Sequence, residues 1–175
     1  KEAKRAGVNL LISKPLFRTS FSSVFEKIYS EQEAEPLLEQ QEEYDFTGKR
    51  VLLVEDHLIN IEVAKYLLVS KNLEVEVAEN GLLGIEAFAA APVGYFDCII
   101  MDVRMPVMDG ILATKSIRQM RKEDAKTIPI IAMTANVFDE DIEKTKVAGM
   151  NAHIAKPIEP NALVCTLNTF FANRG

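Results

Sequence analysis

The chain has 175 residues, enough for one complete domain and part of another. Its 48% of hydrophobic residues and 26% of charged residues are typical of a globular protein that buries a core. The net charge of −6 argues against a nucleic-acid-binding protein, and no apolar run approaches the roughly 18 residues that a membrane span needs.

The first part of the chain repeats a sequence that lies near the C-terminus. The segment AGVNLLISKPL (6–16) aligns without gaps with AGMNAHIAKPI (148–158), and both copies run into a helical apolar pattern. Such internal similarity is typical of a duplicated unit. We therefore expect residues 1–30 to be the last strand and helix of an upstream copy of the same fold. The acidic stretch 31–48 is predicted to be a linker or an exposed helix.

From residue 49 onward, patterns typical of strands and of helices alternate. The strand candidates are short apolar or alternating runs at 51–54, 73–78, 96–101, 128–133 and around Ile154. Helical apolar patterns follow each strand, and they carry Ile61, Ala64 and Leu67, then Leu82, Ile85 and Phe88, then residues 110–120 and 139–148, and finally Leu163, Leu167 and Phe170. A charged loop follows residue 120, and Gly149 is expected to end the helix at 139–148.

Five strands alternating with five helices predict an α/β fold in which right-handed crossovers build a parallel sheet. We expect a doubly wound, flavodoxin-like sheet of five strands in the order 2-1-3-4-5, with helices on both faces, over residues 49–175. Cys98 and Cys165 lie in apolar segments, which predicts buried thiols in a reducing, cytoplasmic compartment. The parent protein could still be anchored in a membrane.

Polar residues follow the predicted strands at the edge where an open parallel sheet binds its ligands. Glu55 and Asp56 follow the first strand, Asp102 the third, Thr134 the fourth and Lys156 the fifth. Three clustered carboxylates repel one another, and a divalent cation such as Mg²⁺ relieves the repulsion. Carboxylates, a cation, a hydroxyl and a lysine together favour phosphoryl transfer, with one carboxylate as the nucleophile.

The segments VLLVEDHLIN, MDVRMPVMDG, MTAN and AKPI resemble, in order and spacing, the receiver domain of two-component response regulators. The resemblance covers residues 49–174. It implies that Asp102 is the phosphoacceptor and that Glu55 and Asp56 hold Mg²⁺, with Asp56 as the more direct ligand. The main-chain carbonyl of Arg104 would complete the ligand set. Asp109, the second aspartate of MDVRMPVMDG, is predicted to form a turn and cap the next helix.

The same resemblance gives roles to two further residues. Thr134 would bind a phosphoryl oxygen and shift on phosphorylation, and Lys156 would form an ion pair with the phosphoryl group. A cis peptide bond is expected between Lys156 and Pro157. One position departs from the family pattern, because His153 stands where a tyrosine or phenylalanine is usual. Signalling through an aromatic rotamer is therefore in question, whereas signalling through Thr134 is not.

The resemblance also implies partners. A histidine kinase or a histidine phosphotransfer domain would donate the phosphoryl group, and phosphorylation would switch the face made of the domain's fourth helix, fifth strand and fifth helix. A homodimer could form through that face. We expect this fragment to contact neither nucleic acid nor membrane. The receiver would catalyse its own phosphorylation and dephosphorylation, although the fragment carries no kinase catalytic domain or nucleotide-binding signature.

Several alternatives remain open from the sequence. The fold could serve as a docking or dimerisation module that needs no phosphorylation. A phosphatase with an aspartate nucleophile would have a second aspartate two residues later, where Arg104 stands. A flavin-binding module is disfavoured because the acids would repel the cofactor phosphate. The parent is expected to be a hybrid sensor histidine kinase whose C-terminal receiver follows the tail of a second receiver-like domain, with a multi-receiver regulator as the alternative.

Overall fold

The computed structural model describes residues 44–135 and 139–172. The predicted upstream strand and helix and most of the acidic stretch lie outside these residues. The described strands are β1 (Arg50–Val54), β2 (Glu74–Ala78), β3 (Cys98–Asp102), β4 (Ile130–Thr134) and β5 (Ala152–Ala155). The described helices are α3 (Leu58–Val69), α4 (Gly81–Ala90), α5 (Gly110–Gln119), the 3₁₀ helix η1 (Glu123–Lys126), α6 (Asp139–Ala148) and α7 (Pro160–Phe171).

The strands form one parallel sheet in the order β2-β1-β3-β4-β5, which confirms the predicted fold class. Strands β3 and β4 are buried along their whole length, because helices cover both faces of the sheet. Their sequences, CIIMD and IIAMT, are accordingly apolar up to the last residue. The polar residue therefore comes at the C-terminal end of each central strand.

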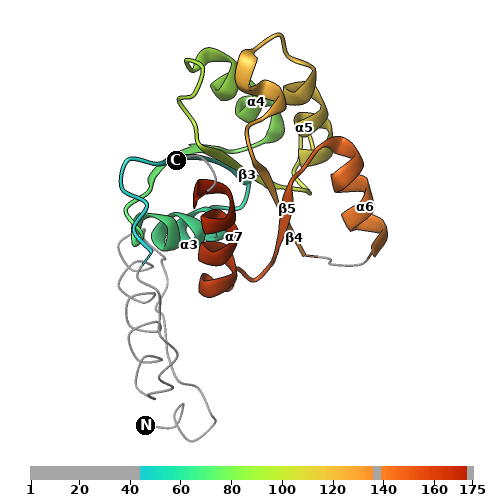
Figure 1. Cartoon of the computed structure of the whole chain (residues 1–175). Coiled ribbons are helices and arrows are strands. Elements are labelled where there is room, and N and C mark those ends of the chain that lie inside the picture. Colours follow the sequence, from blue (N-terminus) through green and yellow to red (C-terminus); the bar gives the residue numbers. More distant parts are fainter. Residues whose placement is uncertain (1–43, 136–138, 173–175) are drawn as a thin grey trace, which may run out of the picture. The chain divides into compact units, whose positions relative to one another are not determined.

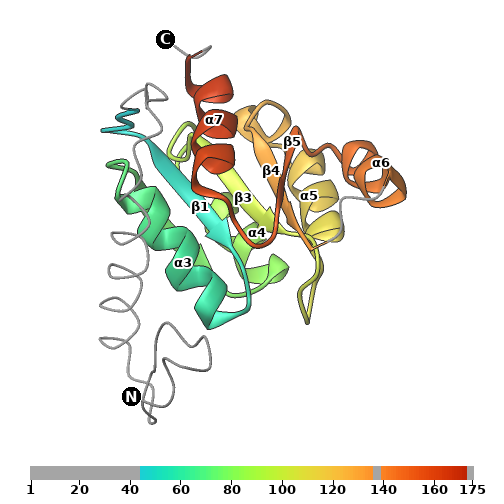
Figure 2. The same cartoon turned by 90° about the horizontal axis from the view of Figure 1, so that it is seen from below.

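Two apolar cores lie on opposite faces of the sheet. Figures 1 and 2 show the helices that cover these faces. Helices α3 and α7 pack on one face over side chains that include Leu53, Ile100 and Met133. Helices α4 and α5 pack on the other face over side chains that include Leu52 and Ile99, and α6 lies against α5. Alternate residues of β1 and β3 thus supply the two cores, as the two-residue period of a strand requires.

The ends of the helices follow the expected signals. Asp109 caps α5, because its Oδ1 accepts a hydrogen bond of 2.8 Å from the Leu112 N–H. Gly149, with a φ of +100°, follows the end of α6. A Cβ on Gly110 would lie 2.1 Å from the Asp102 carbonyl oxygen, so only glycine lets α5 start this close to the end of β3. The Lys156–Pro157 peptide bond is cis, as expected.

The structure differs from the sequence analysis at three places. Phe46, assigned to the acidic linker, is 5% exposed; its ring meets that of Phe171 edge-on at 5.2 Å. The predicted charged loop after α5 contains η1, which buries Ala125. Cys98 is buried as predicted, but Cys165 is exposed because it lies on the outer side of α7. Within the described residues, no helix is both long enough and apolar enough to cross a membrane.

Candidate functional site

The predicted site residues meet at the C-terminal edge of the sheet. Glu55 and Asp56 follow β1, whereas Asp102 and Thr134 are the last residues of β3 and β4. The register pairs Asp102 with Met133 and Thr134 with Ala155, so the central strands end at nearly the same level. The structure therefore places these polar groups together, as the strand order predicted.

Three carboxylates form the centre of the site. Each of Glu55, Asp56 and Asp102 offers an oxygen that lies within 4.8 Å of the other two. Glu55 is fully buried and Asp102 is 6% exposed, whereas Asp56 is exposed. Like charges held this close in a low-dielectric environment need a positive charge for balance. The residues fit Mg²⁺, a hard cation that binds carboxylate oxygens and retains several water ligands.

Lys156 provides one positive charge at the site. Its Nζ lies 2.5 Å from Glu55 Oε2 and 2.6 Å from Asp102 Oδ2, so it bridges two of the three carboxylates. Burial alone would lower the pKa of Lys156, but the hydrogen bonds and charges of Asp102 and Glu55 outweigh burial and raise it. Lys156 is therefore a fixed cation at the pH of the cell.

Asp102 is held through both carboxylate oxygens. Oδ1 accepts a hydrogen bond of 3.1 Å from the Arg104 N–H, and Oδ2 accepts the bond from Lys156. Burial raises the pKa of Asp102 above its ordinary value, and the nearby Glu55 charge acts in the same direction. Lys156 and the Arg104 N–H oppose this effect. The Asp102 carboxylate is thus more basic than an aspartate in water, and higher basicity makes a carboxylate a better nucleophile.

Glu55 is held by a residue that the sequence analysis did not single out. Its Oε1 accepts hydrogen bonds from the His57 N–H at 3.2 Å and from Asn60 Nδ2 at 3.0 Å. Asn60 is the third residue of α3. Its signal in the sequence was weak, because a single asparagine in a first helical turn is usually a solvated or capping residue.

Thr134 and Arg104 lie beside this cluster. Thr134 is 6% exposed, and its carbonyl oxygen accepts a hydrogen bond of 2.8 Å from the Lys156 N–H. The backbone of β4 thereby positions the start of the segment that carries Lys156. The Arg104 side chain is exposed, and its N–H contacts Asp102 as described above.

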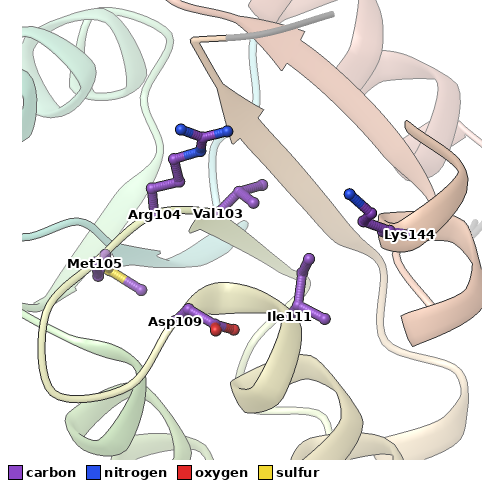
Figure 3. A pocket seen from close by; sticks show the side chains of 6 residues that line it. All are labelled: Val103, Arg104, Met105, Asp109, Ile111 and Lys144. Atoms are coloured by element: carbon purple, nitrogen blue, oxygen red, sulfur yellow. The ribbon is translucent and has the colours of Figure 1, made fainter. Parts of the chain in front are cut away.

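A pocket of about 550 Å³ lies at the loop that follows Asp102. Its walls come from the loop after β3, from the start of α5 and from α6, and its lining residues are Val103, Arg104, Met105, Asp109, Ile111 and Lys144. Figure 3 shows Arg104 and Lys144 on opposite sides of this pocket. Val103 and Arg104 follow Asp102 directly in the chain, so one wall of the pocket is the loop that leaves the end of β3.

His153 joins β5 to α6. Its Nε2 makes a hydrogen bond with Thr145 Oγ1. The Thr145 hydroxyl donates its proton to the Ile142 carbonyl at 2.8 Å, so the imidazole is the donor in the bond between His153 and Thr145. Burial, together with the charge of Lys146, lowers the pKa of His153. The imidazole therefore fills the position of the usual aromatic residue as a neutral, hydrogen-bonded group.

Comparison with known proteins agrees with this site. The response regulator receiver domain family matches residues 51–168. A probable histidine kinase 1 of Oryza sativa subsp. indica is 37% identical over 138 residues, which are 62% of this chain and 14% of that protein. Hybrid signal transduction histidine kinase I of Dictyostelium discoideum is 32% identical over 123 residues, 69% of this chain and 7% of that protein. The chain thus spans a small part of these relatives.

Solved structures give the same result. The receiver domain of the sensor histidine kinase PA1611 from Pseudomonas aeruginosa, with magnesium coordinated in its active-site cleft, is 35% identical with a TM-score of 0.64. The match covers 71% of this chain and 98% of that chain. Chemotaxis protein CheY4 of Vibrio cholerae is 30% identical with a TM-score of 0.65, over 70% of this chain and 98% of that chain. This chain therefore belongs to the response regulator receiver family and contains a receiver domain of two-component signalling.

Proposed function

We propose that Asp102 accepts a phosphoryl group from a phosphohistidine of a histidine kinase or a histidine phosphotransfer domain. The observation that carries this proposal is the position of Lys156, which bridges the buried carboxylates of Asp102 and Glu55. A buried carboxylate with raised basicity, next to a fixed cation, suits attack on phosphorus. We place this activity in the cytoplasm, whose reducing conditions suit the reduced thiols of Cys98 and Cys165.

The transfer exchanges one bond to phosphorus for another. An Asp102 carboxylate oxygen attacks the phosphorus, and an O–P bond forms while the P–N bond to the donor imidazole breaks. The electron pair of the broken bond returns to the imidazole nitrogen. Loss of the phosphoryl group reverses the bond change at Asp102, because water attacks phosphorus and the carboxylate leaves. In both steps the surrounding protein positions the groups and balances charge.

The side chains around Asp102 have separate tasks in this proposal. Lys156 pairs with the carboxylates of Glu55 and Asp102 before transfer and with the phosphoryl group after it. The Arg104 N–H fixes Oδ1 and so orients the Asp102 carboxylate. Thr134 offers a hydroxyl to a phosphoryl oxygen from the end of the neighbouring strand β4. Its displacement on phosphorylation would pass to β5 through the hydrogen bond between Lys156 N–H and the Thr134 carbonyl.

Glu55, Asp56 and Asp102 would hold Mg²⁺, together with the main-chain carbonyl of Arg104. Asp56, exposed beside two buried carboxylates, is the proposed direct ligand from the acidic pair. When bound, the cation neutralises negative charge that develops on the transferring phosphoryl oxygens. The magnesium described for the receiver of PA1611 supports this part of the proposal.

The response of the domain would involve α6, β5 and α7, which are the fourth helix, fifth strand and fifth helix of the sheet domain. Thr134 precedes α6 and Lys156 follows β5, so changes at the site reach this face by two routes. A homodimer could form through the same face. The alternative is a docking role that needs no phosphorylation, and a comparison of phosphorylated with unphosphorylated protein distinguishes the two. The relatives support a hybrid histidine kinase as the parent protein.

Incubation with MgCl₂ and acetyl phosphate, followed by intact mass spectrometry, tests the proposal. The wild-type chain should gain one phosphoryl group, and Asp102→Asn should gain none. Asp109→Asn is the matched control, because asparagine keeps the cap of α5 and this aspartate lies in the same loop. A phosphoryl group retained in Asp102→Asn, or no uptake by the wild-type chain, would contradict the proposal. Size-exclusion chromatography of both forms then tests dimerisation.

A further inference from the structure

We infer that Asn60 is a positioning residue for the phosphoacceptor site. Its side-chain amide holds the Glu55 carboxylate so that Oε2 faces Lys156 and the proposed cation site. The inference rests on the function proposed above and adds a residue that acts through Glu55 rather than on the phosphoryl group. It follows from the distribution of hydrogen bonds around one fully buried carboxylate.

The two oxygens of Glu55 have different partners. Oε1 accepts hydrogen bonds from Asn60 Nδ2 at 3.0 Å and from the His57 N–H at 3.2 Å. Oε2 accepts the bond of 2.5 Å from Lys156 Nζ. A carboxylate oxygen has two lone pairs, so the two N–H donors occupy both lone pairs of Oε1. Oε2 keeps one lone pair besides the bond to Lys156, and this lone pair is available to a cation.

The local structure of α3 explains why the amide is needed. His57, the residue before α3, makes no side-chain capping bond to any described residue. Its N–H donates instead to the Glu55 carboxylate, two residues earlier. The terminal torsion of a glutamate is broad, so each bond to its carboxylate further restricts the rotation of the carboxylate plane. Asn60 supplies a second donor to Oε1 besides the His57 N–H, and together with Lys156 on Oε2 it fixes the plane.

The orientation matters because Lys156 bridges Glu55 and Asp102. If the Glu55 carboxylate turned, the Lys156 ammonium would lose one of its two acceptors and would move toward the other, Asp102 Oδ2. A misplaced ammonium changes the charge at the nucleophile, and a turned carboxylate changes the oxygen presented to Mg²⁺. Groups that orient metal ligands in this way commonly change metal affinity or activity by about 10- to 100-fold when they are removed.

The experiment compares Asn60→Ala with Asn60→Gln in the full chain. Alanine removes the donor and favours the helix, whereas glutamine keeps an amide donor at the same position. Affinity for Mg²⁺ is measured without phosphodonor, from the backbone amide NMR signals of His57 and Arg104 as MgCl₂ is added. Asn80→Ala is the matched control, because Asn80 caps α4 at the same edge of the sheet through a 3.0 Å bond from the Leu83 N–H.

We expect the Kd for Mg²⁺ to rise by about tenfold or more in Asn60→Ala. Because less Mg²⁺ is then bound, we expect the rate of phosphorylation by acetyl phosphate to fall in the same variant. Asn60→Gln should recover most of the Mg²⁺ affinity, and Asn80→Ala should lower the Tm without changing the Kd. Asn60→Leu, close to asparagine in size, replaces Asn60→Ala if the alanine variant does not fold.

Two results would overturn the inference about Asn60 while leaving the proposed function intact. One is an unchanged Kd for Mg²⁺ in folded Asn60→Ala, and the other is an equal loss in Asn60→Ala and Asn60→Gln, which would assign the effect to packing. In both cases the wild-type chain would still bind Mg²⁺ and take up phosphate. A wild-type chain that does neither would contradict the proposed function itself, so the two failures are distinguishable.

Discussion

Lys156 Nζ lies 2.6 Å from Asp102 Oδ2, although the two residues come from the ends of β5 and β3, which are separated by β4. The same ammonium group lies 2.5 Å from Glu55 Oε2, beyond the end of β1. One lysine thus connects the ends of three strands. The ammonium contacts carboxylates that would also bind the proposed cation, so we expect Lys156 and Mg²⁺ to compete for the same negative charge.

Substitution of Lys156 by methionine should therefore tighten Mg²⁺ binding while slowing phosphorylation. Removal of the ammonium relieves a charge repulsion, and we expect the Kd for Mg²⁺ to fall by about tenfold, or about 1.4 kcal/mol. Titration with MgCl₂, followed by NMR, measures this change. Lys49→Met is the control, since Lys49 pairs with Asp97 at 3.2 Å before β1. Weaker Mg²⁺ binding in Lys156→Met would show that the ammonium assists the cation.

Gly110→Ala should impair both stability and phosphorylation. The new Cβ would lie 2.1 Å from the Asp102 carbonyl oxygen, so either the start of α5 or the end of β3 must move. Overpacking of this kind costs about 1–3 kcal/mol, measured by urea unfolding. The displacement of Asp102 should also slow uptake from acetyl phosphate.

Comparison with Gly48→Ala separates the effect of a steric clash, as in Gly110→Ala, from the effect of backbone strain. Gly48 has a φ of +82°, but its added Cβ would meet nothing within 4 Å. This variant should lose about 1–2 kcal/mol through left-handed strain and keep the wild-type rate of phosphorylation. Equal rates for Gly110→Ala and Gly48→Ala would contradict a role for the close approach at Asp102.

Phe46→Ala should destabilise the domain although Phe46 precedes the first strand. The side chain is 5% exposed, and its ring packs edge-on against Phe171 near the end of α7. Loss of a buried phenylalanine costs about 3–5 kcal/mol. Tyr44→Ala, which removes a partly buried ring next to Phe46, should cost less. Equal stability of Phe46→Ala and the wild-type chain in urea would place the domain boundary at Lys49 instead.

The sequence predicted the sheet and the acidic cluster because both depend on local patterns. Apolar runs identify buried strands, and the rule for parallel sheets places the residues after them at one edge. Asp102, Glu55 and Lys156 could therefore be brought together without coordinates. Each of these residues directly follows or ends a strand, so its position did not depend on how any helix is oriented.

Other contacts could not be predicted because they depend on how distant elements approach one another. Phe46 lies in an acidic stretch, so its sequence context predicted a linker and not a core residue. Its partner Phe171 lies far along the chain, at the end of α7. The Arg118 guanidinium donates to the carbonyl oxygens of Ala125, Ile128 and Gly149, a set that no spacing in the sequence indicates. Asn60 likewise needed the orientation of α3 relative to Glu55.

His153 should make stability depend on pH. Burial lowers its pKa in the folded state, so the unfolded chain binds the proton more readily. Stability is retained above the ordinary histidine pKa of about 6.5 and decreases as the pH falls below it through the folded-state value. Urea unfolding across this range should show a smaller decrease for His153→Gln than for the wild-type chain. His57→Gln is the control, because His57 lies at an exposed position. If His153→Gln lost as much stability at low pH as the wild-type chain, His153 would be excluded as the source of the decrease.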